Sequence, residues 1–456
     1  MIQADDRPAA TDAVSRFIGD VSGGKAGPTL VVIGGLHANE PAGIEAAQRV
    51  HKRIGDGDVG LHAGRLVSLR GNLRALGVEA STPWLRERYI DEDLNRAFLL
   101  EPGPAHNGSA EQHERDELSG HLKSIKDCTS GGVFVLDLHT VSSESPAFIA
   151  LEDSLPARRF AARFPLPKIL GLEEELQGLL IDYATNALGC VSCIFEAGLH
   201  DDPRSADVHE AIMLLALAAL GMSGRSPQTL SGESALEVVS QAAAGRQDHF
   251  YDVRQRVEIG AMPFEMRLGA AAFMPVAAER TVLASEDGRE LKASANGLLF
   301  LPNRQPSPRV GDDAFFVIAR VGSIWLTLSA WLRRRRAMHA ILPMLFPGVR
   351  RRKDEPHTIV VAPEYAAILR RELLHLFGYR LVRWIHTPYM PWHARVRGVV
   401  LGVVRSVFGV LRFALRGGEQ AALPNERPTD WIARRHALDL LPSDVHDLGE
   451  TSHDEG

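Results

Sequence analysis

Short apolar runs alternate with amphipathic stretches over the first half of the chain. Each run ends in glycine or polar residues, a pattern that is typical of buried strands. Helical patterns follow the first, second and last of these runs, and the first helix is expected to begin at Pro41. This alternation predicts an α/β fold with a mixed, largely parallel sheet flanked by helices. The predicted strands occupy residues 28–36, 65–72, 131–140 and 188–200, and the later helices occupy 110–126 and 204–221.

The pattern changes twice further along the chain. Residues 1–230 are expected to form the α/β catalytic domain, with the candidate site residues at the polar ends of its strands. Residues 231–322 contain short strand-like runs punctuated by Gly, Pro and Asn, which predicts a small β domain. Residues 323–418 are expected to form a basic, mainly helical extension. Residues 419–456 are polar and acidic and are expected to form a loose tail.

Charge is distributed unevenly, although the net charge of the chain is only −6. Residues 331–416 hold 17 Arg or Lys and four acidic residues. Within them, 393–418 has the pattern of a basic amphipathic helix, which can lie on an anionic membrane surface. The same pattern also fits packing on the enzyme or self-association, so both interpretations of 323–418 remain open. No recognisable nucleic-acid-binding motif accompanies the basic residues, and a nucleic-acid partner is not expected.

The three cysteines provide no disulfide framework and fit a reducing compartment. Cys190 and Cys193 lie in an apolar run, which favours two packed thiols over a redox or metal pair. The N-terminal residues lack the basic and apolar regions of a signal peptide, and no long uncharged apolar stretch predicts a membrane span. A cytoplasmic location is expected, with contact at the inner face of a membrane as an alternative.

Candidate metal ligands lie at the ends of two predicted strands. His37 and Glu40 form a His-x-x-Glu pair in the turn after the first strand, and His139 ends the strand at 131–140. Imidazole nitrogens and a carboxylate are ligands that zinc prefers, and catalytic zinc sites use three protein ligands. Asp137 points to the same side of its strand as His139 and is a candidate to orient a ligand imidazole.

Further polar residues supply the other groups that a hydrolase needs. Glu196 ends the strand at 188–200 and is a candidate general base. Arg88, Asn95 and Arg96 lie in a polar stretch, and arginine presents a planar donor fork that matches a carboxylate. A substrate with a free carboxylate is therefore expected, although a solvated charged loop would have the same composition.

Four sequence blocks occur in a recognisable order. They read GLHANEPAG at 35–43, RYIDEDLNRAF at 88–98, DLHT at 137–140 and EAG at 196–198. Together they resemble the succinylglutamate desuccinylase/aspartoacylase family, a branch of the zinc carboxypeptidase-like fold, over roughly residues 28–320. One departure is Ala38, where the family usually has glycine after the first histidine.

The resemblance implies one zinc ion per chain and a zinc-dependent hydrolase that cleaves the amide bond of an N-acyl amino acid or a similar small carboxylate-bearing molecule. A metallocarboxypeptidase, an ester hydrolase and a non-catalytic, membrane-associated binding module are the alternatives. The implied site residues are the zinc ligands His37, Glu40 and His139, the base Glu196, the carbonyl-polarising Arg88, and the carboxylate-binding pair Asn95 and Arg96.

Overall fold

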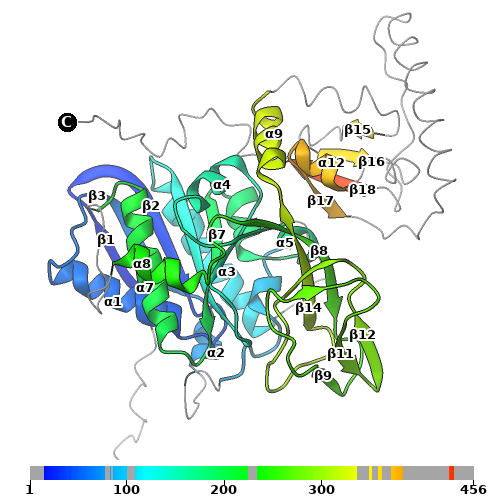
Figure 1. Cartoon of the computed structure of the whole chain (residues 1–456). Helices are drawn as coiled ribbons and strands as arrows, with labels where there is room; N and C mark the ends of the chain where they lie inside the picture. The colour runs from blue at the N-terminus through cyan, green and yellow to red at the C-terminus, as the bar shows by residue number, and fades with distance from the viewer. Residues whose placement is uncertain are drawn as a thin grey trace, which may run out of the picture.

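The computed structural model describes residues 15–77, 83, 86–99, 108–223, 234–335, 349–351, 358–361, 371–383 and 431–435. Figure 1 shows one large sheet with helices on both faces, and a smaller β region beside it. The amphipathic helix predicted over 393–418 lies outside the described residues, as does most of the predicted tail at 419–456.

An 11-stranded mixed sheet forms the centre of the described structure. Strands β3, β2, β4 and β7 run parallel to one another, while β1, β5 and the strands beyond β8 pair antiparallel to at least one neighbour. The mixed α/β fold predicted from the sequence is therefore confirmed. In spatial order the strands are β1 (Phe17–Ser22), β3 (Ala63–Arg70), β2 (Lys25–Gly34), β4 (Val133–Val141), β7 (Val191–Leu199), β5 (Phe148–Leu151), β6 (Lys168–Leu170), β8 (Phe250–Glu258), β14 (Asp313–Val321), β13 (Gly297–Phe300) and β10 (Pro275–Val276).

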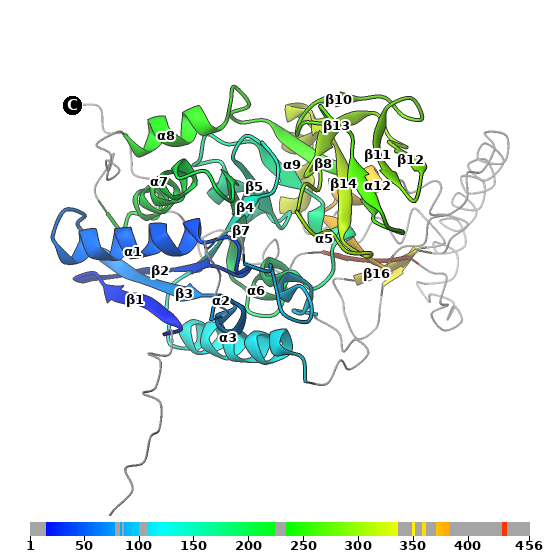
Figure 2. The same cartoon turned by 90° about the horizontal axis from the view of Figure 1, so that it is seen from below.

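Successive side chains along the central strands point to opposite faces of the sheet, so the apolar ones pack alternately into two hydrophobic cores. On β2, Leu30 and Val32 pack on the side that holds helices α1 (Ala42–Gly55), α7 (Arg204–Ala219) and α8 (Ala235–Ala242). Val31 and Ile33 face the opposite core, with helices α3 (Ala110–Asp127) and α6 (Leu180–Asn186). Figure 2 shows these two helix layers on either side of the sheet. Strands covered on both faces read as continuous apolar runs, which is the pattern that the sequence shows.

Two glycines allow helix α1 to begin close to the end of β2. A Cβ atom on Gly34 would lie 2.6 Å from the backbone carbon of Gly43, and one on Gly43 would lie 2.8 Å from Cβ of Leu138. Neither separation tolerates a side chain, so the chain must have glycine here for the helix to pack on the sheet. This close packing holds the intervening turn, residues 35–41, at the ends of β2 and β4.

The chain beyond α8 extends the large sheet and adds a smaller one. Strands β8, β14, β13 and β10 continue the 11-stranded sheet, and a second, three-stranded antiparallel sheet packs beside them (Figure 1). The division of the chain at residues 230, 322 and 418 remains a prediction. The second sheet consists of β12 (Arg289–Lys292), β11 (Val282–Glu286) and β9 (Phe264–Met266).

The described part of the C-terminal extension contains strands as well as helices. The sequence pattern predicted a mainly helical segment, whereas a four-stranded antiparallel sheet accompanies two helices here. Its strands are three to five residues long, too short to show a clear period in the sequence. The helices are α9 (Ser323–Arg334) and α12 (Arg371–Leu376), and the strands are β15 (Val349–Arg351), β16 (Thr358–Val361), β18 (Trp431–Arg435) and β17 (Tyr379–Arg383).

Two further predictions from the sequence concern the packing of the cysteines and the absence of a membrane-spanning helix. Cys190 and Cys193 are both buried and unbonded, which confirms the prediction of two packed thiols. Among the helices of the described residues, none is long and apolar enough to cross a bilayer.

Replacing Phe160 by alanine should lower the free energy of unfolding by about 3–5 kcal/mol, because the change leaves a cavity in the core under α4 (Leu155–Ala161). The ring is fully buried and lies 5.1 Å from Phe134 and 5.3 Å from Phe164, centroid to centroid. Urea denaturation followed by circular dichroism measures the change. Leu268→Ala is the control, because Leu268 is 89% exposed and its loss should cost less than about 0.5 kcal/mol. Equal effects of the two substitutions would contradict this description of the core.

Candidate active site

The predicted metal ligands meet at the carboxyl ends of two neighbouring strands. His37 and Glu40 lie in the turn after β2, and His139 lies near the end of β4, which pairs parallel to β2. All three side chains are buried. Open α/β sheets place their sites at this edge, so the parallel pairing of β2 and β4 brings the three residues together. Within the described residues they form the one group of three or more His, Cys, Asp or Glu side chains whose ligand atoms could share an ion.

The ligand atoms of this group lie close enough to require a positive charge between them. Nδ1 of His37 is 3.1 Å from Nδ1 of His139 and 3.0 Å from Oε1 of Glu40. Nδ1 of His139 is 2.8 Å from Oε2 of Glu40. Two ring nitrogens that face each other with bare lone pairs repel, so either a proton or a metal ion must lie among the three groups.

These separations fit the donor set of a zinc ion. Zinc binds imidazole and carboxylate ligands at about 2.0–2.1 Å, so tetrahedral ligand atoms lie about 3.3 Å from one another. The observed distances of 3.1, 3.0 and 2.8 Å are within a few tenths of an ångström of that value. Small side-chain movements would therefore admit the ion without rearranging the backbone.

A carboxylate lies behind each imidazole. Nε2 of His37 is 2.9 Å from Oδ1 of Asp93, and Nε2 of His139 is 2.9 Å from Oδ2 of Asp137. Such carboxylates fix the tautomer of a ligand histidine, so that the opposite nitrogen faces the metal. The sequence pointed to Asp137 for this role but not to Asp93.

The protonation of the cluster follows from its burial and from these neighbours. Burial raises the pKa of Glu40, but the adjacent His37 and His139 outweigh it and hold the pKa well below the ordinary value. Burial lowers the pKa of His139, but Asp137 and Glu40 outweigh it and raise the pKa well above the ordinary value. The site therefore favours a cation held against carboxylates, which is also what a divalent ion requires.

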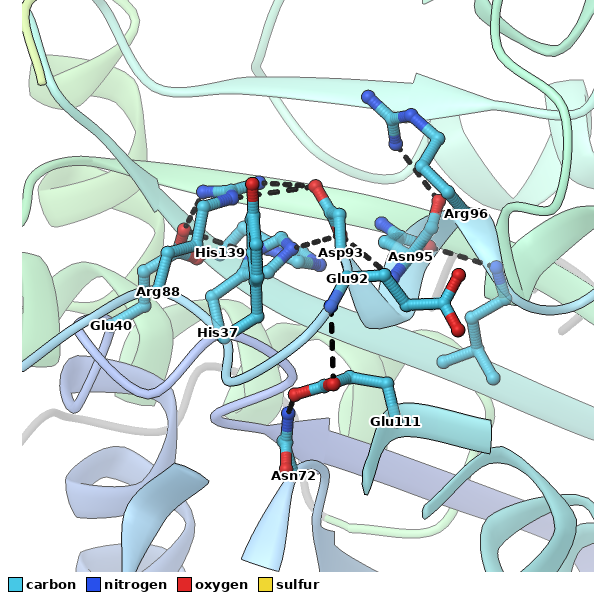
Figure 3. Close-up of polar contacts among 12 residues, drawn as sticks. His37, Glu40, Asn72, Arg88, Glu92, Asp93, Asn95, Arg96, Glu111 and His139 are labelled. Atoms are coloured by element: carbon cyan, nitrogen blue, oxygen red, sulfur yellow. Dashed lines mark hydrogen bonds and ion pairs between the residues drawn. The ribbon is translucent and has the colours of Figure 1, made fainter. Parts of the chain in front are cut away.

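Arg88 links the ligand turn to the loop that carries Asp93. Its Nη1 donates to Oε1 of Glu40 at 2.8 Å, and its Nε lies 3.4 Å from Oδ2 of Asp93. Figure 3 shows the guanidinium beside both carboxylates. The backbone contributes as well, because the amide of Ala38 donates to the carbonyl of Arg88 at 3.1 Å. Arg88 is thus fixed next to the ligand atoms, with part of its side chain facing the pocket.

Glu111 holds this loop to the N-terminus of α3. Its carboxylate is fully buried and accepts hydrogen bonds from the amides of Ile90 and Asp91, at 2.8 and 3.0 Å, and from Nδ2 of Asn72 at 3.0 Å. Asn72 in turn caps α2 (Leu73–Leu76). Figure 3 shows its side chain beside the carboxylate of Glu111. The sequence analysis did not identify Glu111, because its role depends on amides that lie 20 residues away along the chain.

Glu196 lies on the strand next to His139. The two residues are register partners in the parallel pair of β4 and β7, and both line the same pocket. Burial raises the pKa of Glu196 to about 8, and the Glu40 and Asp137 carboxylates add to this, although His139 and Arg88 oppose it. A carboxyl group with a pKa near neutrality can both accept and return a proton, which is what a general base and acid must do.

Asn95 and Arg96 also line the pocket, but each already has a partner. Oδ1 of Asn95 accepts from the amide of Leu180 at 2.9 Å. Nη2 of Arg96 donates to Oδ2 of Asp313 at 2.9 Å, and Asp313 also accepts from Nε of Arg256 at 2.6 Å. The sequence analysis missed Asp313 and Arg256, which follow Arg96 by more than 150 residues and lie on β14 and β8.

The pocket in front of these residues is small and has two kinds of wall. Its volume is about 130 Å³, and polar groups of the metal cluster form one side. The other side is apolar and includes Leu176, Leu179 and Phe316. The sequence analysis also missed His200, which lines the pocket and whose Nδ1 lies 2.7 Å from Oγ1 of Thr140. The shape suits a small molecule that combines polar and apolar parts.

The fold and this donor set define a candidate hydrolase centre on an α/β sheet. Residues 26–219 match the model of the succinylglutamate desuccinylase/aspartoacylase catalytic domain. The match covers all four sequence blocks, so the resemblance to the succinylglutamate desuccinylase/aspartoacylase family that they predicted is confirmed over residues 26–219. No curated protein sequence matches the chain significantly.

Solved structures similar to the chain include succinylglutamate desuccinylases. The protein from Vibrio parahaemolyticus is 17% identical with a TM-score of 0.47, and the match covers 65% of this chain and 82% of that one. The protein from Chromobacterium violaceum is 16% identical with a TM-score of 0.45, covering 66% and 86%. The ectoine utilization protein EutE from Ruegeria pomeroyi is 21% identical with a TM-score of 0.44, covering 65% and 86%.

Replacing Glu111 by glutamine should lower the free energy of unfolding by about 1–3 kcal/mol and reduce turnover as well. The amide nitrogen of glutamine cannot accept from the backbone amides that the carboxylate now binds, so the loop carrying Arg88 and Asp93 loses its anchor. Thermal unfolding and steady-state kinetics measure the two effects. Glu237→Gln is the control, because Glu237 occupies the first turn of α8 but is exposed. Wild-type behaviour of Glu111→Gln would refute the anchoring role.

Proposed function

We propose that the chain is a zinc-dependent hydrolase that cleaves the amide bond of an N-acyl amino acid or a similar small carboxylate-bearing substrate. The observation that carries this proposal is the convergence of His37, Glu40 and His139 beside Arg88 and Glu196 in one pocket. The match of residues 26–219 to the desuccinylase/aspartoacylase catalytic domain supports the reaction class.

The metal-binding residues in this proposal are His37, Glu40 and His139. A divalent ion held there would supply Lewis acidity and the activation of water. The hydrogen bond between Nε2 of His37 and Asp93 orients the first imidazole for this, and Asp137 lies 2.9 Å from Nε2 of His139, where it balances the charge of the second. Zinc is the ion that two histidines and one carboxylate favour in hydrolases.

Glu196 acts as the general base in this proposal and then as the general acid. It takes a proton from the attacking water and delivers it to the nitrogen of the leaving amine, so that the amine leaves as a neutral group. Its place on β7, opposite His139 on β4, puts the carboxyl group on the same wall of the pocket as the metal ligands.

In this proposal Arg88 and Arg96 stabilise negative charge on the substrate. The guanidinium of Arg88, fixed by Glu40 and Asp93, donates to the carbonyl oxygen as charge develops on it during the attack. Arg96 binds the substrate carboxylate with the Nδ2 amide of Asn95, since Oδ1 of Asn95 is engaged by Leu180. Binding requires Arg96 to share its donors between the substrate and Asp313.

Replacing Glu196 by glutamine should reduce turnover by about 10²–10⁴-fold while zinc content stays at wild-type level, because the base is lost but the ligands remain. The assay is a hydrolysis screen of zinc-loaded protein over N-acetyl, N-succinyl and longer N-acyl amino acids, the corresponding esters and short peptides. Zinc is measured by mass spectrometry on the same samples, and Glu290→Gln, on exposed strand β12, is the control. Unchanged turnover in Glu196→Gln would remove Glu196 from the mechanism. Cleavage confined to peptides would instead favour a metallocarboxypeptidase.

Removing the metal by chelation should abolish hydrolysis, and adding zinc should restore it. In His139→Ala the protein should no longer retain zinc after dialysis, because one of three ligands is lost. The stabilisation that zinc gives to the wild type, seen as a rise in Tm on adding the ion, should shrink in the same variant. His249→Ala is a matched control at a histidine outside the pocket. Full activity in the chelated protein would contradict a metal-dependent reaction.

A further inference from the structure

A single turn of helix forms part of the apolar wall of the active-site pocket. Helix α5 spans only Leu172–Glu175 and ends at Leu176, and both leucines are buried and line the pocket beside the metal cluster. They belong to one apolar cluster with Phe316 of β14. One turn is not stable on its own, because its few hydrogen bonds do not repay the entropy of nucleation. The position of this wall therefore depends on the groups that hold α5 from outside.

The C-terminal extension holds α5 through buried polar contacts. Nε2 of His375, on α12, lies 2.7 Å from Oε1 of Glu174. On β17, Nε of Arg380 lies 3.6 Å from Oε1 of Glu173, and its Nη1 lies 3.9 Å from Oε1 of Glu174. All four side chains are at most 7% exposed, and Figure 1 shows α5 next to both β8 and β17. Buried carboxylates are costly without such partners, so the extension supplies what the acidic face of α5 requires.

The contact between His375 and Glu174 has a fixed direction. Burial and the adjacent Arg380 lower the pKa of His375, so its imidazole is neutral at physiological pH. Nη1 of Arg380 lies 3.2 Å from Nδ1 of His375, and because a guanidinium can only donate, Nδ1 accepts and Nε2 carries the proton. His375 therefore donates to the carboxylate of Glu174. Arg380 is held in turn, since its Nε donates to Oδ2 of Asp153, between β5 and α4, at 3.1 Å.

A second set of contacts connects α5 to the residue proposed to bind the substrate carboxylate. Nη1 of Arg256, on β8, donates to the carbonyl oxygen of Glu175 at 3.0 Å. Nε of the same arginine donates to Asp313 at 2.6 Å, and Asp313 also accepts from Arg96 at 2.9 Å. A displacement of α5 would therefore change the separation between the apolar wall and the carboxylate-binding group.

We propose that the C-terminal extension completes the substrate pocket. His375 and Arg380 are positioning residues that hold α5, and Leu172 and Leu176 then limit the length of the apolar acyl group that the pocket accepts. This inference rests on the proposed function, and it assigns a role in specificity to a segment outside the family match at 26–219. One methylene changes kcat/KM by about 10–200-fold in an apolar pocket, so a small shift of this wall changes which acyl group is preferred.

The kcat/KM values of the full, zinc-loaded chain over N-acyl amino acids of increasing acyl length test the proposal. In His375→Ala the preference for the best acyl group over the next longer one should fall at least about tenfold, with zinc content unchanged. Leu172→Ala, which shortens the wall directly, should shift the preference in the same direction. His375→Gln keeps a donor of similar reach and should restore most of the preference. Ile359→Ala is the control, because it leaves a cavity in β16 of the extension but changes no charge beside α5.

Hydrogen–deuterium exchange of the same variants reports on α5 without any substrate. The amides of Glu174 and Leu176 donate within this turn and should exchange at least about tenfold faster in His375→Ala, but not in Ile359→Ala. Unchanged exchange at α5 in His375→Ala would overturn the proposal, as would faster exchange with an unchanged acyl preference. A wild type that hydrolyses no N-acyl amino acid would refute the proposed function and the acyl assignment with it, whereas the exchange rates would still decide whether the extension positions α5.

Discussion

The central constraint on this structure is the need for a cation among three buried side chains. His37, Glu40 and His139 bring two imidazole nitrogens and a carboxylate within about hydrogen-bonding distance of one another, away from solvent. Such an arrangement is unfavourable unless a positive charge lies at its centre. Parallel pairing of β2 with β4 creates it, and glycines at 34 and 43 let the ligand turn pack tightly enough to complete it.

The residues around the cluster also help to hold a cation among the three ligands. Asp93 and Asp137 lie behind the imidazoles, Arg88 balances the carboxylates, and Glu111 secures the loop that carries Arg88 and Asp93. These groups are buried or partly buried and come from three different segments of the chain, so their positions are mutually dependent. The same strand edge carries Glu196, which is why a proton-transfer group lies beside the metal ligands.

Much of the fold and of the candidate site could be predicted from the sequence, because the sequence patterns that indicate them are local. Long apolar strands ending in polar residues located β2, β4 and β7, and their ends located His37, His139 and Glu196. Strands of two to four residues such as β5, β6 and β10 carry no such period, and their places in the sheet were missed. Partnerships between distant segments were missed too: Arg96 with Asp313, and Glu111 with the loop before Asp93, depend on tertiary contacts that no local pattern encodes.

X-ray absorption spectroscopy of the zinc-loaded protein tests the central claim most directly, since it reports the ligands of the ion itself. The spectrum should show nitrogen and oxygen ligands at about 2.0–2.1 Å with the multiple-scattering signal of two imidazoles. In His139→Asn the signal should fall to that of one imidazole, or the ion should be lost. A spectrum with sulfur ligands, or one that is unchanged in His139→Asn, would show that the zinc lies elsewhere in the chain and that this cluster is not the metal centre.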